Sequence, residues 1–178
     1  MKFTECNLKG IIIIEPNLYK DNRGFFLEIF QQDRYQALGI KDIFLQDNHS
    51  RSIRNVIRGF HFTKSTKQSQ ILTVVRGRIF DVIVDIREGS STFGQWFGIE
   101  LSDDATRQIY MPHGFAHGFC VLSDYADLHY KVSAKYDTSF EAGFRWDDPN
   151  IAVDWPISNP IVSDRDSKHP YFNEIFNL

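Results

Sequence analysis

The sequence predicts an all-β fold, a sandwich or barrel of short strands, on three observations. Beyond residue 70, a period of two runs through six segments rich in Val, Ile, Phe and Tyr, at residues 71–75, 79–86, 96–101, 108–111, 118–122 and 128–133. Gly, Asp or Ser separates these segments at intervals typical of a sandwich or barrel. No segment between them has a helical period long enough for a βαβ crossover.

Fewer regular elements are expected outside these segments. The β-branched run of residues 11–14 stops at a Glu-Pro pair, which indicates a strand entering a turn. One early helix is expected over residues 33–38, with Gly39 as its C-cap. From Asp147 onward, four prolines predict an extended segment along the surface. The N-terminus lacks the apolar core of a signal peptide, and the run of residues 11–14 is too short to span a bilayer.

Length and composition predict a single soluble domain over residues 1–178. The chain is 42% hydrophobic and 24% charged, which argues against intrinsic disorder. A formal net charge of -3 makes nucleic acid a poor candidate for the main ligand. Cys6 and Cys120 lie far apart with no CxxC pair, so neither a disulfide framework nor a structural zinc site is indicated, and a reducing cytoplasm is expected.

Aromatic residues are unusually frequent, with 16 Phe, 7 Tyr and 3 Trp making up 15% of the chain. Most are expected to fill the core. Some could instead line a cavity that stacks on a flat or ring-shaped ligand.

Histidines lie in three aromatic-rich strand contexts: His61 in RGFHF, His117 in GFAHGF and His129 in LHYKVS. A lone histidine on a strand is most often a partly buried structural imidazole. His61 follows Arg58 by three residues, so the two side chains face opposite sides of a strand unless Gly59 introduces a bulge. With such a bulge, the pair would be a base beside an anion clamp.

The stretches RGFHF and PHGFAHGF resemble the two half-motifs of the cupin superfamily of small jelly-roll barrels. A metal-binding cupin is expected to carry two His and a Glu on the first motif and a further His on the second. Here the first motif offers only His61, and Gln70 or a neighbour stands where the Glu would be. Two imidazoles without a carboxylate make a poor metal site, so no catalytic metal is expected.

A closer resemblance covers nearly the whole chain. It is carried by collinear strings of unusual sequence, namely DNRGFFLE, QDNHSRS, VIRGFHF, VVRGRIFDVIVDIREGSSTFGQW, MPHGFAHGFCVLSD, WDDP and VSDRD. These strings resemble the dTDP-4-dehydrorhamnose 3,5-epimerase family. The resemblance implies a metal-free and cofactor-free cupin jelly-roll, or double-stranded β-helix, with short peripheral helices. It also implies an isomerase that supplies dTDP-rhamnose for lipopolysaccharide, O-antigen or other polysaccharides.

The implied chemistry inverts carbons that flank the carbonyl of a nucleotide-linked 4-keto-6-deoxy sugar. A proton next to a ketone is acidic enough for a neutral imidazole to remove, and re-protonation from the opposite face inverts the centre. By the resemblance, His61 is the base, Asp166 orients it and Tyr130 returns the proton.

The resemblance also implies the substrate contacts and the assembly. Arg23 and Arg58 are the expected pyrophosphate clamps, and Phe26 and Trp146 are candidate stacking surfaces. The complete set of expected substrate-binding residues is Arg23, Phe26, Glu28, Gln46, Asn48, Arg58, Gln70, His117, Phe119, Glu141, Trp146 and Arg165. A homodimer is implied, with the N-terminal strand around Arg23 to Glu28 crossing to the partner's site.

Gln70 departs from the family pattern, because a lysine expected to stabilise the enolate usually stands there. A neutral amide replaces a charge-assisted donor, so the intermediate would be held more weakly. The enzyme could be slower, act on one carbon only, or accept a different 4-keto nucleotide sugar. Two alternative functions stay open: a cupin 3,4-ketoisomerase, and a weakly active or non-catalytic nucleotide-sugar-binding homologue.

Overall fold

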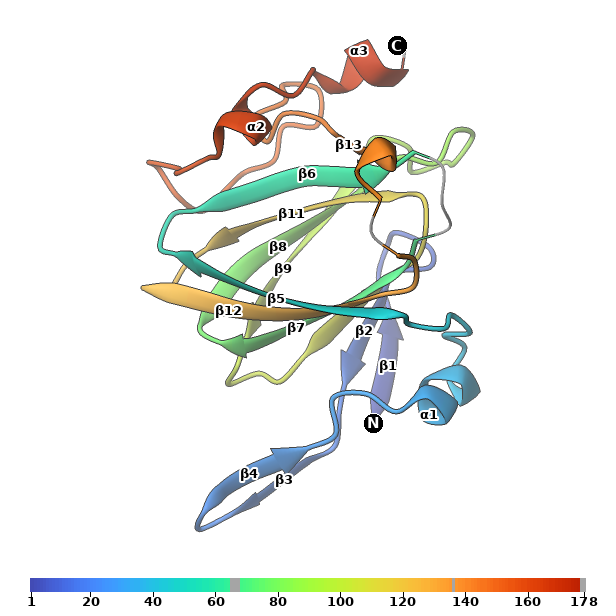
Figure 1. Ribbon diagram of the computed structural model, residues 1–178, viewed down its shortest axis with the longest axis vertical. Coiled ribbons are helices and arrows are strands. Elements are labelled where there is room, and N and C mark those ends of the chain that lie inside the picture. The colour runs from blue at the N-terminus through green and yellow to red at the C-terminus, as the bar shows by residue number, and fades with distance from the viewer. Residues whose placement is uncertain (65–67, 136, 177–178) are drawn as a thin grey trace.

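Two antiparallel sheets face each other in the computed structural model, which describes residues 1–64, 68–135 and 137–176 (Figure 1). The first sheet contains, in spatial order, β1 (Lys2–Glu5), β2 (Ile12–Glu15), β10 (Gln108–Met111), β7 (Gln70–Arg76), β12 (Tyr125–Val132) and β5 (Gln46–Ile53). The second contains β13 (Glu141–Gly143), β6 (Ile57–Thr63), β11 (Phe115–Val121), β8 (Arg78–Asp85) and β9 (Trp96–Ser102). The predicted all-β class is therefore confirmed.

Each of the six strands predicted beyond residue 70 is present. The expected β10 boundaries are reproduced, whereas β11 begins at Phe115 and β12 at Tyr125, earlier than residues 118 and 128. The sequence pattern did not reveal β5, because its residues QDNHSRSI carry almost no apolar side chains. Its side chains nevertheless alternate between more and less exposed positions, as expected of a strand at the edge of a sheet.

The outer faces of β7 and β8 are covered as well as their inner faces, which explains the long apolar runs in these two strands. On β7, Leu72 points into the core between the sheets, while its neighbour Ile71 packs on the outer face with Tyr35 of α1 (Gln32–Ala37). On β8, Ile83 joins the same inner core and Val82 packs on the outer face. Successive side chains of a strand point to opposite faces, so a sheet buried on both sides needs apolar residues at consecutive positions.

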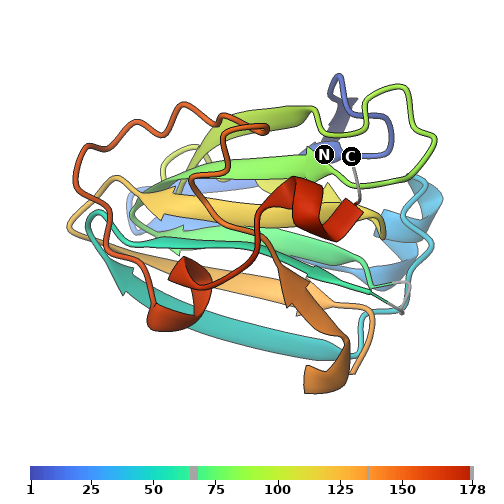
Figure 2. The ribbon, with the colours of Figure 1, turned by 90° about the horizontal axis from the view of Figure 1, so that it is seen from above.

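The C-terminal segment crosses the outer face of the second sheet (Figure 2). It buries an aromatic cluster there, in which the rings of Phe60 and Phe144 stack at 4.8 Å and Phe172 meets Phe144 edge-on at 5.2 Å. Much of the aromatic content therefore fills this layer.

The prediction of an entirely extended C-terminal segment is wrong, since it contains α2 (Asp164–Ser167) and α3 (Phe172–Phe176). The Ser163 hydroxyl caps α2 by accepting from the backbone N–H of Asp166 at 3.0 Å, a local signal that the spacing of the prolines concealed. None of the described helices has the length and apolar character needed to cross a membrane.

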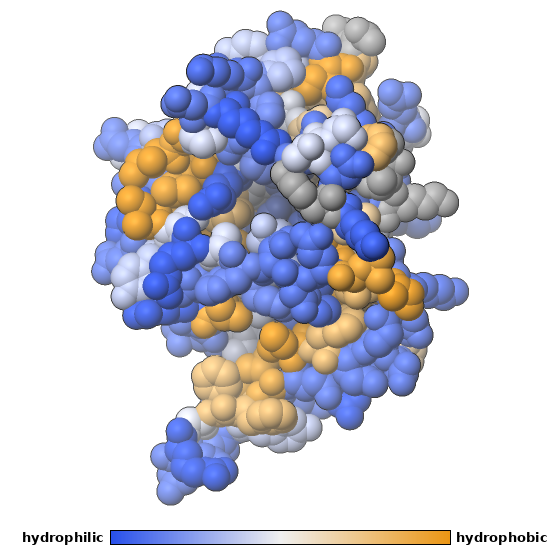
Figure 3. Space-filling model, in the orientation of Figure 1, coloured by the Kyte–Doolittle hydropathy of each residue, from blue (hydrophilic) through white to orange (hydrophobic). Residues whose placement is uncertain are grey.

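The predicted early helix is confirmed as α1, and Gly39 ends it with a φ of 103° and an N–H that donates to the Gln36 carbonyl. Before it, β3 (Leu18–Asp21) and β4 (Gly24–Leu27) form a hairpin that projects from the body of the protein (Figure 1). The tip of this hairpin is hydrophilic, and apolar surface lies between the tip and the body (Figure 3). Phe25 and Phe26 on β4 are 61% and 68% exposed, an unusual amount of apolar surface for two adjacent rings.

Candidate active site

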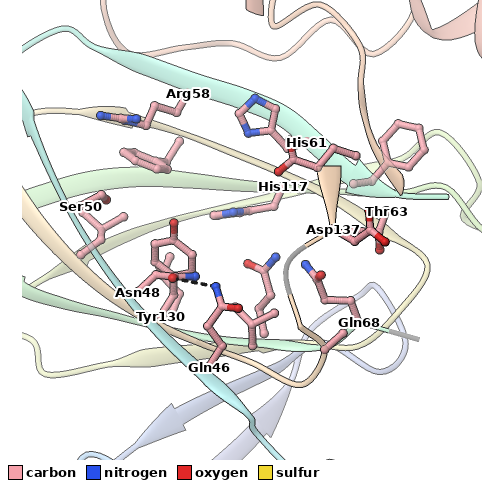
Figure 4. A pocket seen from close by; sticks show the side chains of 18 of the residues that line it. Gln46, Asn48, Ser50, Arg58, His61, Thr63, Gln68, His117, Tyr130 and Asp137 are labelled. Carbon is pink, nitrogen blue, oxygen red and sulfur yellow. Dashed lines mark hydrogen bonds between the residues drawn. The ribbon is translucent and has the colours of Figure 1, made fainter. Parts of the chain in front are cut away.

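A pocket of about 470 Å³ lies between the two sheets and is lined by strands of both (Figure 4). Ten of the residues expected from the sequence line it: Gln46, Asn48, Arg58, His61, Gln70, His117, Phe119, Tyr130, Glu141 and Arg165. They come from β5, β6, β7, β11, β12, β13 and α2, so residues far apart in the chain converge on one cavity.

A bulge in β6 brings Arg58 and His61 to the same pocket. His61 pairs with His117 and Arg58 pairs with Phe119, so three steps along β6 match two along β11. Gly59 lies in this bulge with a φ of 127°, and a Cβ there would come within 2.5 Å of the Gly118 Cα. The conditional prediction of a bulge at Gly59 is confirmed.

His61 is paired with the buried carboxylate of Asp166. His61 Nε2 lies 2.8 Å from Asp166 Oδ1, and the Gly59 N–H donates to Asp166 Oδ2 at 3.2 Å. Burial raises the pKa of Asp166, but the hydrogen bond and charge of His61 together with the Gly59 N–H outweigh it, so the net pKa is below the usual carboxyl range. An ionised carboxylate only accepts, so Nε2 of His61 carries the proton and Nδ1 holds the lone pair of the neutral ring.

Tyr130 lies on the other wall of the pocket. It belongs to β12 of the first sheet, whereas His61 belongs to β6 of the second, and both line the cavity (Figure 4). A sugar ring between the sheets would therefore meet an imidazole on one face and a phenol on the other.

His117 forms a second imidazole–carboxylate pair at the back of the pocket. Its Nε2 lies 2.6 Å from Oδ1 of Asp81, a fully buried residue of β8. Asp81 Oδ2 has no hydrogen-bond partner among the described residues. This contact with a buried carboxylate fixes the orientation of the His117 ring at the pocket wall.

Carboxamides dominate the wall formed by β5 and β7. Gln46 donates to Asn48 at 2.9 Å, and Gln68 and Gln70 line the pocket near them. The guanidinium of Arg58 lies across the cavity and donates to the Ser52 hydroxyl at 2.9 Å, a neutral partner that leaves its charge available to an anion.

Asp166 lies behind His61 rather than in the lining, and four further expected residues lie outside this pocket. Arg23 and Phe26 are on the projecting hairpin, where Arg23 pairs with Asp21 at 2.6 Å. Glu28 follows the hairpin and lies 3.1 Å from Arg34. Trp146 is half-buried, and its carbonyl accepts a hydrogen bond from the Trp155 indole. Within one chain, the structure does not bring these four residues together with His61.

Sequence reasoning missed several residues in and behind the pocket. Ser50, Thr63, Gln68 and Asp137 line it, and Asp81 lies behind His117. The signal for Asp81 was its place between apolar residues of β8, since a charge at a buried strand position needs a partner. His169, close to Asp166, was overlooked in the proline-rich segment.

The fold places groups that could ligate a metal ion beside His61. Asp166 supplies the carboxylate that the first motif lacks, and one ligand atom each from His61, Asp166 and His169 lies within 4.8 Å of the other two. The closest two of these atoms, His61 Nε2 and Asp166 Oδ1, are already joined by a hydrogen bond.

Comparison with known proteins identifies close relatives over nearly the whole chain. The family profile of dTDP-4-dehydrorhamnose 3,5-epimerase matches residues 5–174. The dTDP-4-dehydrorhamnose 3,5-epimerase of Methanothermobacter thermautotrophicus is 44% identical over 168 residues, covering 93% of this chain and 91% of that protein. The dTDP-4-dehydrorhamnose 3-epimerase of Streptomyces niveus is 41% identical over 168 residues, covering 93% of this chain and 81% of that protein.

A solved structure agrees equally well. The Legionella pneumophila dTDP-6-deoxy-D-glucose-3,5-epimerase, crystallised with dTDP-4-keto-L-rhamnose, has a TM-score of 0.94 and 44% identity, covering 98% of this chain and 94% of that chain. Such likeness confirms the predicted cupin jelly-roll barrel. Matched over nearly its full length in both sequence and structure, the chain belongs to the dTDP-4-dehydrorhamnose 3,5-epimerase family, a family of isomerases.

Proposed function

We propose that the protein is an epimerase that inverts C3, C5 or both in a dTDP-linked 4-keto-6-deoxy sugar. One observation supports this proposal: His61 and Tyr130, on facing sheets, border one cavity in a chain of this family. In the relative crystallised with dTDP-4-keto-L-rhamnose, the ligand is a 4-keto sugar of this class.

His61 acts as the base. Asp166 holds the proton on Nε2, so the Nδ1 lone pair removes the hydrogen next to the C4 carbonyl. The electron pair moves into an enolate, and the imidazolium that forms is stabilised by the Asp166 carboxylate. Tyr130 gives its phenolic proton to the same carbon from the opposite face, which inverts the centre. Proton exchange with water restores both groups for the next cycle.

The enolate oxygen requires donors that strengthen as its charge develops. His117, backed by Asp81, and the Gln70 amide are the candidates. Since a neutral amide contributes less than an ammonium to a developing charge, Gln70 favours slower turnover or inversion of a single centre. The Streptomyces niveus relative is itself named a 3-epimerase.

The nucleotide would bind to the polar residues that line the cavity. Arg58 is the pyrophosphate clamp, because a guanidinium forks onto phosphate oxygens, and Gln46, Asn48 and Glu141 offer hydrogen bonds to the nucleoside and sugar. Arg165 is held by Glu141 at 2.7 Å and adds a second positive charge at the rim.

The functional unit would be a homodimer in which each projecting hairpin reaches the partner's pocket. This assembly would cover Phe25 and Phe26 and would bring Arg23, Phe26 and Glu28 to a second copy of the cavity.

Trp146 stays a predicted stacking surface for the base or sugar of the substrate. We further propose a place in the cytoplasm, where the free thiols of Cys6 and Cys120 would persist, and a role in supplying a deoxysugar to polysaccharides.

A panel of 4-keto sugars carried on dTDP, GDP and CDP tests the proposal, followed by proton NMR in deuterated water. We expect deuterium at C3 or C5 with the ketone still at C4, and dTDP as the preferred carrier. Migration of the carbonyl would instead identify a 3,4-ketoisomerase, and binding without any exchange would identify a non-catalytic homologue.

A further inference from the structure

His169 is a second imidazole at the proposed catalytic carboxylate. Its Nε2 lies 3.6 Å from Asp166 Oδ1, the same oxygen that His61 Nε2 contacts at 2.8 Å. The two imidazole rings meet edge-on with centroids 5.9 Å apart. One carboxylate oxygen therefore faces two groups that can each carry a proton.

His169 is largely buried in a space that the neighbouring residues shape to fit its ring. The side chain is only 14% exposed, and Nε2 is buried without a hydrogen-bond partner among the described residues. A Cβ at Gly143 would lie 2.7 Å from this nitrogen, so glycine at position 143 makes room for the ring. At 3.6 Å the contact with Asp166 is too long for a hydrogen bond and close enough for an ion pair.

Burial lowers the pKa of His169, and the charge of His61 lowers it further. The ring is therefore neutral at neutral pH and gains its proton only in acid. The charged or titratable groups facing it come from three elements: His61 on β6, Glu141 on β13, and Arg165 and Asp166 on α2.

We propose that His169 is a positioning residue for Asp166. While its ring is neutral, the Asp166 carboxylate stays paired with His61, and when the ring is protonated it draws that carboxylate away from His61. This inference rests on the proposed epimerase function. A neutral His169 shields the carboxylate from water on the side away from the pocket. A protonated His169 is a full cation 3.6 Å from Oδ1, and its charge competes with the His61 ring for the same carboxylate oxygen. Protonation of His169 is thus a second inactivating event in acid.

The first test is the slope of the acid limb of the kcat/KM profile. Because two protonations inactivate the wild-type enzyme, its log kcat/KM falls with a slope approaching about 2 per pH unit, against about 1 for a single protonation. His169→Phe keeps the ring shape and has no proton, so its slope is about 1. His169→Gln keeps a polar group beside Asp166 without a group that titrates in acid, and we expect the same shallow slope. His113→Phe, which removes an exposed imidazole from a surface turn, keeps the wild-type slope.

The second test needs no substrate. Proton–nitrogen NMR of the ligand-free protein follows the titration of the His169 ring, and we expect its midpoint to rise in His61→Phe, because a neighbouring positive charge has been removed. An unmoved His169 midpoint, or equal slopes for the wild type and an active His169→Gln, would overturn the inference. Absence of epimerase activity in the wild type would refute the proposed function and leave the NMR result standing on its own.

Discussion

His61 and Asp166 meet at 2.8 Å although 105 positions separate them in the chain. The contact depends on two local structural features, a β-bulge and a helix cap. The β6 bulge at Gly59 turns His61 toward the cavity, and the Ser163 cap starts the short α2 helix that carries Asp166. Asp166 is also held by the Gly59 N–H, so the bulge and the carboxylate fix each other. The pair is oriented by its surroundings before any substrate binds.

Asp166→Asn should lower kcat by about 10²–10⁴-fold with a smaller effect on KM, since an amide can hold the wrong His61 tautomer and does not stabilise the imidazolium. Steady-state kinetics on a dTDP-linked 4-keto-6-deoxy sugar would measure this. Asp164→Asn, on the exposed side of the same helix, is the matched control and should keep wild-type kinetics. Equal kinetics of the two variants would contradict the role of Asp166.

Tyr130→Phe should separate proton removal from inversion. His61 still removes and returns a proton on its own face, so the substrate continues to exchange with deuterated water, while inverted product falls by about 10²-fold or more. Chiral analysis of the recovered sugar, alongside NMR, distinguishes the two outcomes. Tyr125→Phe on the same strand serves as the control. Inverted product at the wild-type rate would remove Tyr130 as the acid.

Gln70→Lys should raise turnover without changing the stereochemical course, because a charged donor contributes about 1.5–3 kcal/mol to an anion where a neutral one contributes about 0.5–1.5. Gln68→Lys adds the same charge at a neighbouring lining position and should give no such gain. A slower Gln70→Lys enzyme, or one making a different epimer, would show that the amide is adapted to this protein's own substrate.

Mixing two inactive variants tests the crossed hairpin. His61→Ala and Arg23→Ala subunits, unfolded together and refolded, would form heterodimers with one intact site, which takes His61 from one subunit and Arg23 from the other. We expect substantial activity to return in the mixture and none in either variant refolded alone. If the Arg23→Ala protein is fully active, or the mixture stays inactive, the proposed exchange between subunits fails.

The sequence predicted those parts of the fold that depend on local pattern. Strands with apolar periodicity, the Gly39 cap and the bulge at Gly59 each follow from a few neighbouring residues. It did not reveal β5, where polar side chains at a sheet edge carry no apolar signal. It also missed α2, because its cap was read as part of a proline-rich extended segment.

The sequence also did not show which residues far apart in the chain meet in the folded protein. The resemblance to a family named His61, Asp166 and Tyr130, but only the fold places Asp81 behind His117 and His169 beside Asp166. These contacts join residues on separate strands and turns, and nothing in the spacing of the chain encodes them. The hairpin residues Arg23 and Phe26 show the same limit, since neither lines the pocket of its own chain.

Proton NMR in deuterated water with wild-type protein and His61→Ala, on the same 4-keto-6-deoxy nucleotide sugar, tests the central claim most directly. Proton abstraction by His61 predicts that the wild type incorporates deuterium at C3, C5 or both, and that His61→Ala loses this exchange while still binding the nucleotide. Exchange at both carbons at the wild-type rate in His61→Ala would contradict it.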